Sequence, residues 1–228
     1  MNYKKGVLNS QKELNLLSKN KKQIVVKAKF GPSKITTIPL TLCDKIAFLA
    51  GVIIGDGHLK KSKKQIAIEL TEKKLIKEIQ TTFKIIFDRK FNIKKVKKRS
   101  NRKQSYSLVA DSKALHNLFN QVFEIPIGKK SHLVKIPEII KNSNRKIKLS
   151  FLKGILVTEG GKRRRHYGLS TASKELWSDL IALFKELKIP LFTDKWIYKK
   201  YNKEYYGIAF KCKYLPFLMQ ECRSGQTE

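Results

Sequence analysis

The sequence predicts an α/β fold of the α+β type, in which one structural unit occurs twice along the chain. An apolar helix that ends in an acid followed by glycine occurs in each half, at Asp56 and at Glu159. The same order of predicted elements follows each acid. The distances also agree, because the turn at Asn101 lies 45 residues after Asp56 and the turn at Asn202 lies 43 residues after Glu159. A tandem duplication explains this order and spacing better than chance.

The charge of the chain indicates a polyanionic partner. The 228 residues include 50 Lys and Arg against 18 Asp and Glu, a formal net charge of +32. Hydrophobic residues make up 41%, which is enough to build a core and excludes a wholly disordered basic tail. Self-repulsion at this charge opposes the compact state, so we expect a binding partner that neutralises it. Nucleic acid is the first candidate and an anionic membrane surface is the second.

Neither a membrane span nor a signal peptide is expected. The longest uncharged apolar run, Ile46 to Gly55, has ten residues, whereas a bilayer span needs roughly 20. The N-terminal segment has no apolar core of the signal-peptide type. The three cysteines, Cys43, Cys212 and Cys222, are odd in number and lack metal-type spacing. We therefore expect a cytoplasmic, nucleoid-associated protein that is not bound to a membrane.

Residues 1–40 are interpreted as a basic N-terminal lead-in before the first repeat. A short helical patch is expected at Gln11–Ser18, followed by strands at Gln23–Phe30 and Ile35–Ile38 that Gly31 and Pro32 separate.

The first repeat is assigned to residues 41–124. A capping box at Thr41-x-x-Asp44 is expected to start an apolar helix. The expected elements are helix Lys45–Gly55, strand Gln65–Thr71, helix Glu72–Asp88, hairpin strands Asn92–Arg99 and Gln104–Ala110, and helix Ser112–Phe123. In the strand, Ile66, Ile68 and Leu70 alternate toward a helical layer and are expected in the core.

A connector at residues 125–144 leads to the second repeat, residues 145–222, and a tail at residues 223–228. The expected elements of this repeat are helix Arg145–Thr158, strand Arg165–Thr171, helix Ser173–Leu187, hairpin strands Leu191–Lys200 and Tyr205–Cys212, and a helix that starts near Tyr214. Read from the residues alone, each repeat is therefore an α-β-α-ββ-α unit.

The two motif helices read LAGVIIGDG and LKGILVTEG, and each carries small residues at a spacing of four. These are Ala47, Gly51 and Gly55 in the first and Ser150, Gly154 and Thr158 in the second. Small residues on one helical face allow two backbones to approach closely, so we expect the helices to pack together and bring Asp56 near Glu159. Two nearby carboxylates repel each other unless a cation lies between them, and hard oxygen ligands suit Mg²⁺.

With these two motifs, the sequence resembles the LAGLIDADG homing endonucleases, in particular the monomeric, archaeal-type members with two repeats. The resemblance implies αββαββα-like half-domains, with the motif helices at their interface and saddle-shaped antiparallel β-sheets over the DNA. It implies an intron-encoded DNA endonuclease (a phosphodiester hydrolase) that makes Mg²⁺-dependent double-strand breaks in a long target and leaves short 3′ overhangs. Mn²⁺ or Ca²⁺ can substitute for binding.

The resemblance also implies roles for particular residues. Asp56 and Glu159 correspond to the metal-binding acids of the family, and the carbonyls of Gly55 and Thr158 correspond to further metal ligands. Lys162, three residues after Glu159, corresponds to a basic residue that assists catalysis in some relatives.

The chain also departs from the family pattern. Ile54 and Val157 replace the first acid of the motif. Where relatives often carry a polar or basic residue at the end of the first strand, this chain has Leu70 and Thr71, so Gln65, Lys64 or a hairpin residue remain open as substitutes.

Basic and polar residues near the predicted sheets are candidates for contact with double-stranded DNA, because β-ribbons of this kind can enter a major groove. The candidates are Lys60, Lys64, Gln65, Lys94, Lys95, Lys97, Lys98, Arg99, Arg102, Lys103, Arg163, Arg164, Arg165, His166, Lys195, Lys199, Lys200 and Lys203. His58 directly follows the first motif and is interpreted as a loop or phosphate-contacting residue.

Two other functions remain open at this point. An RNA maturase would use the same basic saddle to bind intron RNA and assist splicing. A catalytically silent DNA-binding regulator would have no need to hold two carboxylates together, so the intact acid pair favours the endonuclease.

Overall fold

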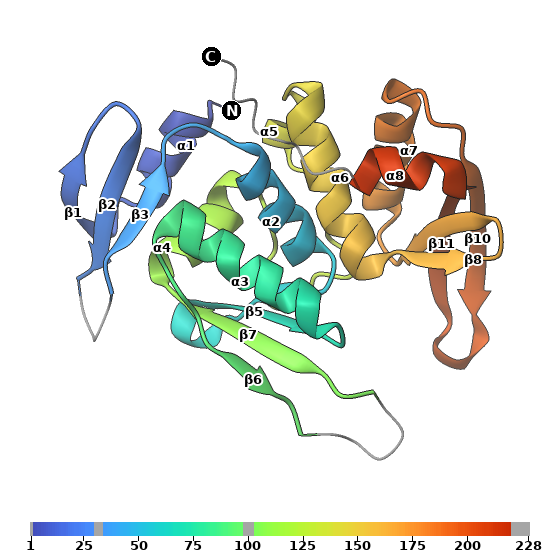
Figure 1. Cartoon of the computed structure of the whole chain (residues 1–228), viewed down its shortest axis with the longest axis horizontal. Coiled ribbons are helices and arrows are strands. Elements are labelled where there is room, and N and C mark those ends of the chain that lie inside the picture. Colours follow the sequence, from blue (N-terminus) through green and yellow to red (C-terminus); the bar gives the residue numbers. More distant parts are fainter. Residues whose placement is uncertain (1, 30–33, 98–102, 220–228) are drawn as a thin grey trace.

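Two helices cross at the centre of the molecule in the computed structural model, α2 (Asp44–Ile54) and α6 (Arg145–Glu159) (Figure 1). The structure describes residues 2–29, 34–97 and 103–219. One β-sheet lies on each side of this helix pair, and a third, N-terminal sheet lies beyond the first repeat (Figure 1).

The first repeat has the element order αββαββα. Its sheet has the strand order β4-β5-β7-β6, and all three pairings are antiparallel. After α2 the elements are β4 (Gly57–Leu59), β5 (Gln65–Leu70), α3 (Lys73–Phe87), β6 (Ile93–Lys95), β7 (Tyr106–Asp111) and α4 (Lys113–Asn117), which continues as a π-helical turn, Leu118–Val122.

The second repeat has the same element order and the equivalent strand order, β8-β9-β11-β10. After α6 its elements are β8 (Gly161–Arg163), β9 (His166–Thr171), α7 (Lys174–Glu186), β10 (Phe192–Tyr198), β11 (Lys203–Lys211) and α8 (Leu215–Met219). The two-repeat α+β fold is thus confirmed. The unit read from residues alone lacked β4 and β8, since strands of three residues have too little alternation to be recognised.

The core lies between each sheet and its helices. In β5, Ile66, Ile68 and Leu70 are buried as expected, and α3 covers them with its apolar face. In the second repeat, Leu169 and Phe210 occupy the corresponding layer below α7. Alternation along the strands therefore assigns one sheet face to the core and leaves the other free.

The N-terminal segment differs from its prediction. A helix forms at α1 (Tyr3–Ser10), whereas most of the expected helix Gln11–Ser18 lies in β1 (Leu14–Lys19). The prediction was wrong because β1 pairs antiparallel with β2 (Gln23–Ala28), and this pairing overrides the local helical pattern. The third strand, β3 (Thr36–Pro39), pairs antiparallel with β2 and completes the sheet.

Arg89 and Gln11 fasten this sheet to the first repeat. The Arg89 guanidinium donates to the Lys34 carbonyl at 2.9 Å and to the Asp111 carbonyl at 3.0 Å, so it joins the start of β3 to the end of β7. The Gln11 side-chain amide donates to the Ala114 carbonyl in α4 at 3.0 Å. The N-terminal sheet is therefore held to the first repeat by buried polar contacts as well as by the shared core.

Three local features differ from their prediction: the start of α2, the turn of the second hairpin and the connector. The N-cap of α2 is Cys43, which makes no side-chain capping bond, and Asp44 is the first helical residue, so the expected capping box is absent. The second hairpin turns through Lys199–Tyr201 and Asn202, which adopts a positive φ of 46°. The connector also contains a short helix, α5 (Glu138–Lys141). The tail at residues 223–228 and Cys222 lie outside the described residues. Among the helices that the structure describes, none combines the length and apolar character needed to cross a bilayer.

Candidate metal and nucleic-acid site

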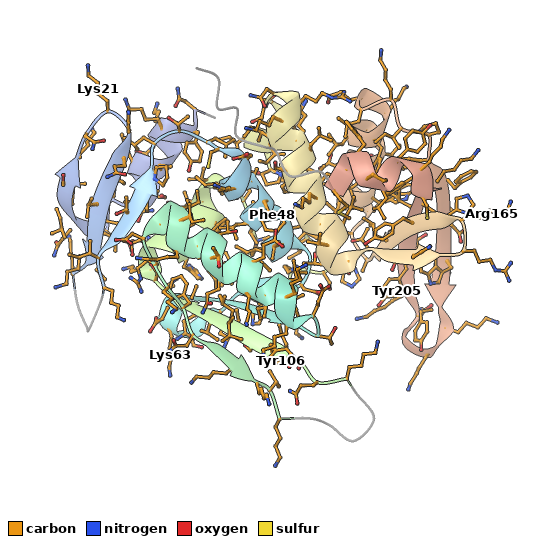
Figure 2. All side chains as sticks on the ribbon, viewed as in Figure 1. Lys21, Phe48, Lys63, Tyr106, Arg165 and Tyr205 are labelled. Atoms are coloured by element: carbon orange, nitrogen blue, oxygen red, sulfur yellow. The ribbon has the colours of Figure 1, made fainter. Side chains whose placement is uncertain are left out.

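Glycine allows α2 and α6 to approach closely at their crossing. A Cβ atom on Gly51 would lie 2.1 Å from the Phe151 carbonyl oxygen, and one on Gly154 would lie 2.2 Å from the Phe48 carbonyl oxygen. A Cβ on Gly55 would lie 2.0 Å from the Thr158 hydroxyl oxygen. The small-residue stripes predicted from sequence therefore form the helix contact, and Phe48 marks this interface in Figure 2.

The two acids lie together where these helices end. Asp56 follows Gly55, the C-cap of α2, and Glu159 is the last residue of α6. Each residue keeps more than a third of its surface exposed, yet neighbouring atoms remove enough water to raise the pKa of both carboxyls. The Asp56 charge raises the pKa of Glu159 further. This repulsion indicates that the carboxylates face a common space at the helix junction.

Lys130, from the connector, supplies positive charge at this junction. Its ammonium group donates to the carbonyls of Ile54 and Gly55 at the end of α2. Its positive charge offsets part of the rise in pKa that burial causes at both acids. Burial lowers the pKa of Lys130 to about 8, although Glu159 and Asp56 act in the opposite direction.

The donors at this junction fit a divalent cation. Two carboxylates and the Gly55 carbonyl are hard oxygen ligands, and an ammonium group already stands among them as a cation. The described residues contain no group of three His, Cys, Asp or Glu side chains that could hold a metal. Further ligands would come from backbone carbonyls, such as the expected one of Thr158, and from water or phosphate oxygens.

Lys130 was not among the residues expected at this site, because residues 125–144 were interpreted only as a connector. The only sequence signal is its position just after Gly128, which adopts a positive φ of 82°. Since Lys130 is one of 50 basic residues, that signal is too weak to single it out.

A groove opens on each side of the acid pair. The first has a volume of about 890 Å³ and includes Asp56, Glu69, Glu72, Lys97 and Lys103 in its lining. The second has a volume of about 630 Å³ and is lined in part by Glu159, Lys129, Lys130, His132, Lys203 and Tyr205. Each acid therefore belongs to a different groove, although the acids are neighbours.

Strand register determines which hairpin side chains face away from the helices in the second repeat. Lys195 lies opposite the buried Tyr206, so it starts from the helix-facing side of the sheet. Trp196 lies opposite Tyr205 on the other face, and their rings stack with centroids 6.1 Å apart. Lys203, two residues before Tyr205, is on this same free face.

The first sheet divides its hairpin in the same way. Lys95 lies opposite Tyr106 on the side of the core strand residues. Lys94 lies opposite Ser107 on the free face, and Glu69 pairs with Ser107 from the other side of β7. His58 lies opposite Ala67 on that free face and is exposed. Tyr106 and Tyr205 mark the two sheets in Figure 2, on either side of the helix pair.

The other candidate residues are spread along the outer surface. Lys162 is exposed on β8, and Arg165 is exposed in the turn between β8 and β9, where it extends from the edge of the molecule in Figure 2. His166 contacts Phe192 with ring centroids 4.9 Å apart. Exposed positions are also found for Lys64, Lys97, Lys103, Arg164, Lys199 and Lys200, while Lys60 and Gln65 are half-buried. Arg163 is described only in its β8 backbone, and Lys98, Arg99 and Arg102 lie outside the described residues.

Comparison with protein families identifies the motif. The family model of the LAGLIDADG-like domain matches residues 44–122, which include α2, Asp56 and the first sheet. Residues 44–122 are therefore similar to the LAGLIDADG-like domain, and the second half of the chain repeats the element order of that segment.

Solved structures share this fold. The homing endonuclease I-DmoI in complex with DNA and Ca has a TM-score of 0.58 at 20% sequence identity, and the match covers 78% of this chain and 91% of that one. The N-terminal LAGLIDADG domain of WhiA has a TM-score of 0.52 at 15% identity, covering 81% of this chain and 83% of that one.

Curated relatives match over a limited segment. The chain is 28% identical over 169 residues to the probable translation initiation factor IF-2 of Methanocaldococcus jannaschii, covering 72% of this chain and 13% of that protein. It is 28% identical over 166 residues to the replication factor C small subunit of the same organism, covering 73% of this chain and 9% of that protein. The chain therefore spans about a tenth of the length of these relatives.

Proposed function

We propose that the protein is a site-specific homing endonuclease that makes Mg²⁺-dependent double-strand breaks in a long DNA target and leaves short 3′ overhangs. The observation that carries this proposal is the meeting of Asp56 and Glu159 at the helix crossing, with one groove beside each acid. One acid per groove suits an enzyme that cuts two antiparallel strands on either side of a pseudo-twofold axis.

In this mechanism the chain's own residues hold and orient the reacting groups. Asp56, Glu159 and the Gly55 carbonyl would hold the divalent ion, and the glycine contacts between α2 and α6 fix the separation of the two acids. Bound Mg²⁺ would activate water and stabilise the 3′-oxygen leaving group. Because Glu159 ends α6 and Asp56 directly follows the C-cap of α2, we expect the acids to move little when DNA enters, which would keep the site preorganised.

The free faces of the two sheets supply the DNA contacts in this proposal. Lys94 on the first sheet and Lys203 with Tyr205 on the second point away from the helices, on opposite sides of the acid pair. Lysines can contact phosphates, and a two-stranded ribbon fits the major groove. A net charge of +32 is consistent with neutralising many phosphates. We further propose that the protein acts as a monomer, because a single chain already contains both acids.

The relatives support a mobile coding element. IF-2, the replication factor C small subunit and a glutamine–fructose-6-phosphate aminotransferase, all of Methanocaldococcus jannaschii, have unrelated names, yet each matches this chain over 166 to 169 residues. A segment shared by such different proteins is separate from the activity that names each of them. Inserted elements that spread by cutting DNA would produce this pattern, and the I-DmoI structure with bound DNA and Mn is of the same fold.

A cleavage assay on a randomised double-stranded DNA library tests this function. We expect discrete breaks with short 3′ overhangs in Mg²⁺ and none in EDTA, and sequencing of the ends would give the target. Tight binding without any cleavage in Mg²⁺ would overturn the endonuclease and favour the silent regulator. Preferred binding of structured intron RNA would favour the maturase.

A further inference from the structure

The connector carries Lys130 to the acid pair on a short, fixed turn. The Gly128 amide donates to the Leu59 carbonyl of β4 at 2.8 Å, and Ile127 forms a parallel bridge with Leu59. After Lys130, its own carbonyl accepts from the amides of Leu133 at 2.8 Å and Val134 at 3.1 Å. The position of the Lys130 backbone is therefore set by hydrogen bonds on both sides.

The far end of this turn is fastened to the second repeat. The Ser173 hydroxyl, at the start of α7, donates to the Val134 carbonyl, and His132 contacts the Ala172 carbonyl at 3.1 Å. The segment thus crosses from β4 to α7 directly beside the junction of the motif helices. Lys130 reaches the acids from the connector and belongs to neither repeat, so the duplication provides no second copy of it.

The Lys130 ammonium lies among the oxygen atoms that a metal ion would bind. It donates to the carbonyls of Ile54 and Gly55 at the C-terminal, negative end of α2. Carbonyls at a helix C-terminus lack an amide from a next helical turn as donor. It also lies close enough to attract both Asp56 and Glu159. Without a cation there, only the solvent would screen the repulsion between the two carboxylates.

We propose that Lys130 is an internal counter-ion that holds the acid pair together in the metal-free protein, and that its ammonium group competes with the divalent ion for the Gly55 carbonyl and the two carboxylates. This inference rests on the proposed function, in which the same acids bind the metal. An ammonium group and a divalent cation repel each other, so both cannot occupy the same donors at full strength. Metal binding would then include displacement of Lys130.

The test compares Lys130→Met with Lys129→Met by titration with Mn²⁺ alone, without DNA, following free Mn²⁺ by electron paramagnetic resonance. Methionine keeps the length of the side chain but removes the charge. Lys129 is exposed and is the matched control, because its replacement changes the net charge equally. We expect the dissociation constant for Mn²⁺ to fall about tenfold in Lys130→Met relative to Lys129→Met, since a nearby charge shifts such equilibria by one or more powers of ten.

Thermal unfolding in EDTA gives a second readout. Lys130→Met should unfold at a lower temperature than Lys129→Met, because it lacks the internal counter-ion. Its unfolding temperature should also rise more than that of Lys129→Met when Mn²⁺ is added. If Lys130→Met does not fold, the comparison is made in a Glu159→Gln background, where one repelling charge is gone and the loss of Lys130 should be better tolerated. An unchanged or weaker affinity for Mn²⁺ in Lys130→Met would overturn the proposal. So would a drop in unfolding temperature from Lys130→Met that is as large in the Glu159→Gln background as in the unaltered protein.

Asp56→Asn separates this inference from the proposed function. One outcome would overturn only the role of Lys130. In that outcome the unaltered protein binds Mn²⁺ and Asp56→Asn abolishes the binding, but Lys130→Met does not increase the affinity. If neither the unaltered protein nor any variant binds Mn²⁺, both the metal site and the role of Lys130 fail.

Discussion

The two repeats share one fold but surround their acids differently. Strand order is equivalent in the two sheets, and each motif helix ends at an acid. The described lining of the groove beside Asp56 adds two acids, Glu69 and Glu72, to two lysines, Lys97 and Lys103, whereas that of the groove beside Glu159 adds three lysines and no further acid.

This difference shows that duplication fixed the backbone and the acid pair, while the electrostatics of the two halves diverged. Among the residues that the structure describes, those lining the second groove place more positive charge near the acid than those lining the first. We therefore expect equivalent backbone positions to hold the two DNA strands, with unequal electrostatic contributions from the two halves. The following variants test which parts of the site are shared and which are not.

The largest effect is expected from the acids, which both halves share. Asp56→Asn or Glu159→Gln should slow cleavage of both strands by about 10²–10³-fold, a loss typical of removing charge stabilisation from a transition state. DNA binding in Ca²⁺ should remain, because most of the affinity comes from phosphate contacts on the sheets. Strand-resolved cleavage kinetics measure both rates. If one acid variant slowed only the strand nearest to it, the acids would work separately instead of as one pair.

The helix crossing is the next most sensitive feature. In Gly154→Ala the added Cβ would meet the Phe48 carbonyl oxygen, so we expect a loss of about 1–3 kcal/mol in the free energy of unfolding, as for other overpacked sites. Urea denaturation followed by circular dichroism gives this value. Gly161→Ala is the control, since nothing lies within 4 Å of its added Cβ. Equal stability of the two variants would contradict the close helix contact.

Charge changes in the two grooves should act in opposite directions. Lys203→Ala should weaken DNA binding and lower the slope of log affinity against log salt by about one, because one phosphate contact is lost. Glu69→Gln should strengthen binding between about 1.4- and 5-fold, which corresponds to ~0.2–1 kcal/mol for an exposed charge.

Salt titrations of binding measure both effects. Lys195→Ala is the control for Lys203→Ala, since it removes the same charge from the helix-facing side of the same hairpin. If Lys195→Ala lowered the slope as much as Lys203→Ala, the assignment of the DNA-binding face would be wrong.

The smallest effect concerns pH. Because their pKa values are raised, Asp56 and Glu159 bind more protons in the folded protein than in the unfolded chain at pH values above the ordinary carboxyl pKa of about 4. The free energy of unfolding in EDTA should therefore fall as pH rises through this window. Glu159→Gln should make the fall of unfolding free energy with pH less steep. Glu69→Gln, which changes a residue away from the helix junction, should leave the steepness of that fall unchanged. Urea denaturation at a series of pH values checks the slope, and identical slopes in both variants would contradict the coupling of the acids.

The sequence allowed prediction of the repeats because two motifs at matching distances constrain both the helix pair and the acids. The small-residue stripes led directly to the contacts of Gly51 and Gly154. The N-terminal sheet was harder, since β1 becomes a strand only through pairing with β2.

Lys130 could not be predicted, because its role depends on hydrogen bonds that carry the connector from β4 to α7. Likewise, Lys95 and Lys195 could not be separated from their neighbours before strand register placed them on the helix-facing sides.

The measurement that most directly tests the acid pair is end sequencing of the DNA library after incubation with the unaltered protein and with the Asp56→Asn/Glu159→Gln double variant, both in Mg²⁺. We expect discrete breaks with short 3′ overhangs for the unaltered protein, and intact DNA with retained binding for the double variant. The same breaks in both samples would show that the acids at the helix crossing do not carry out the cleavage.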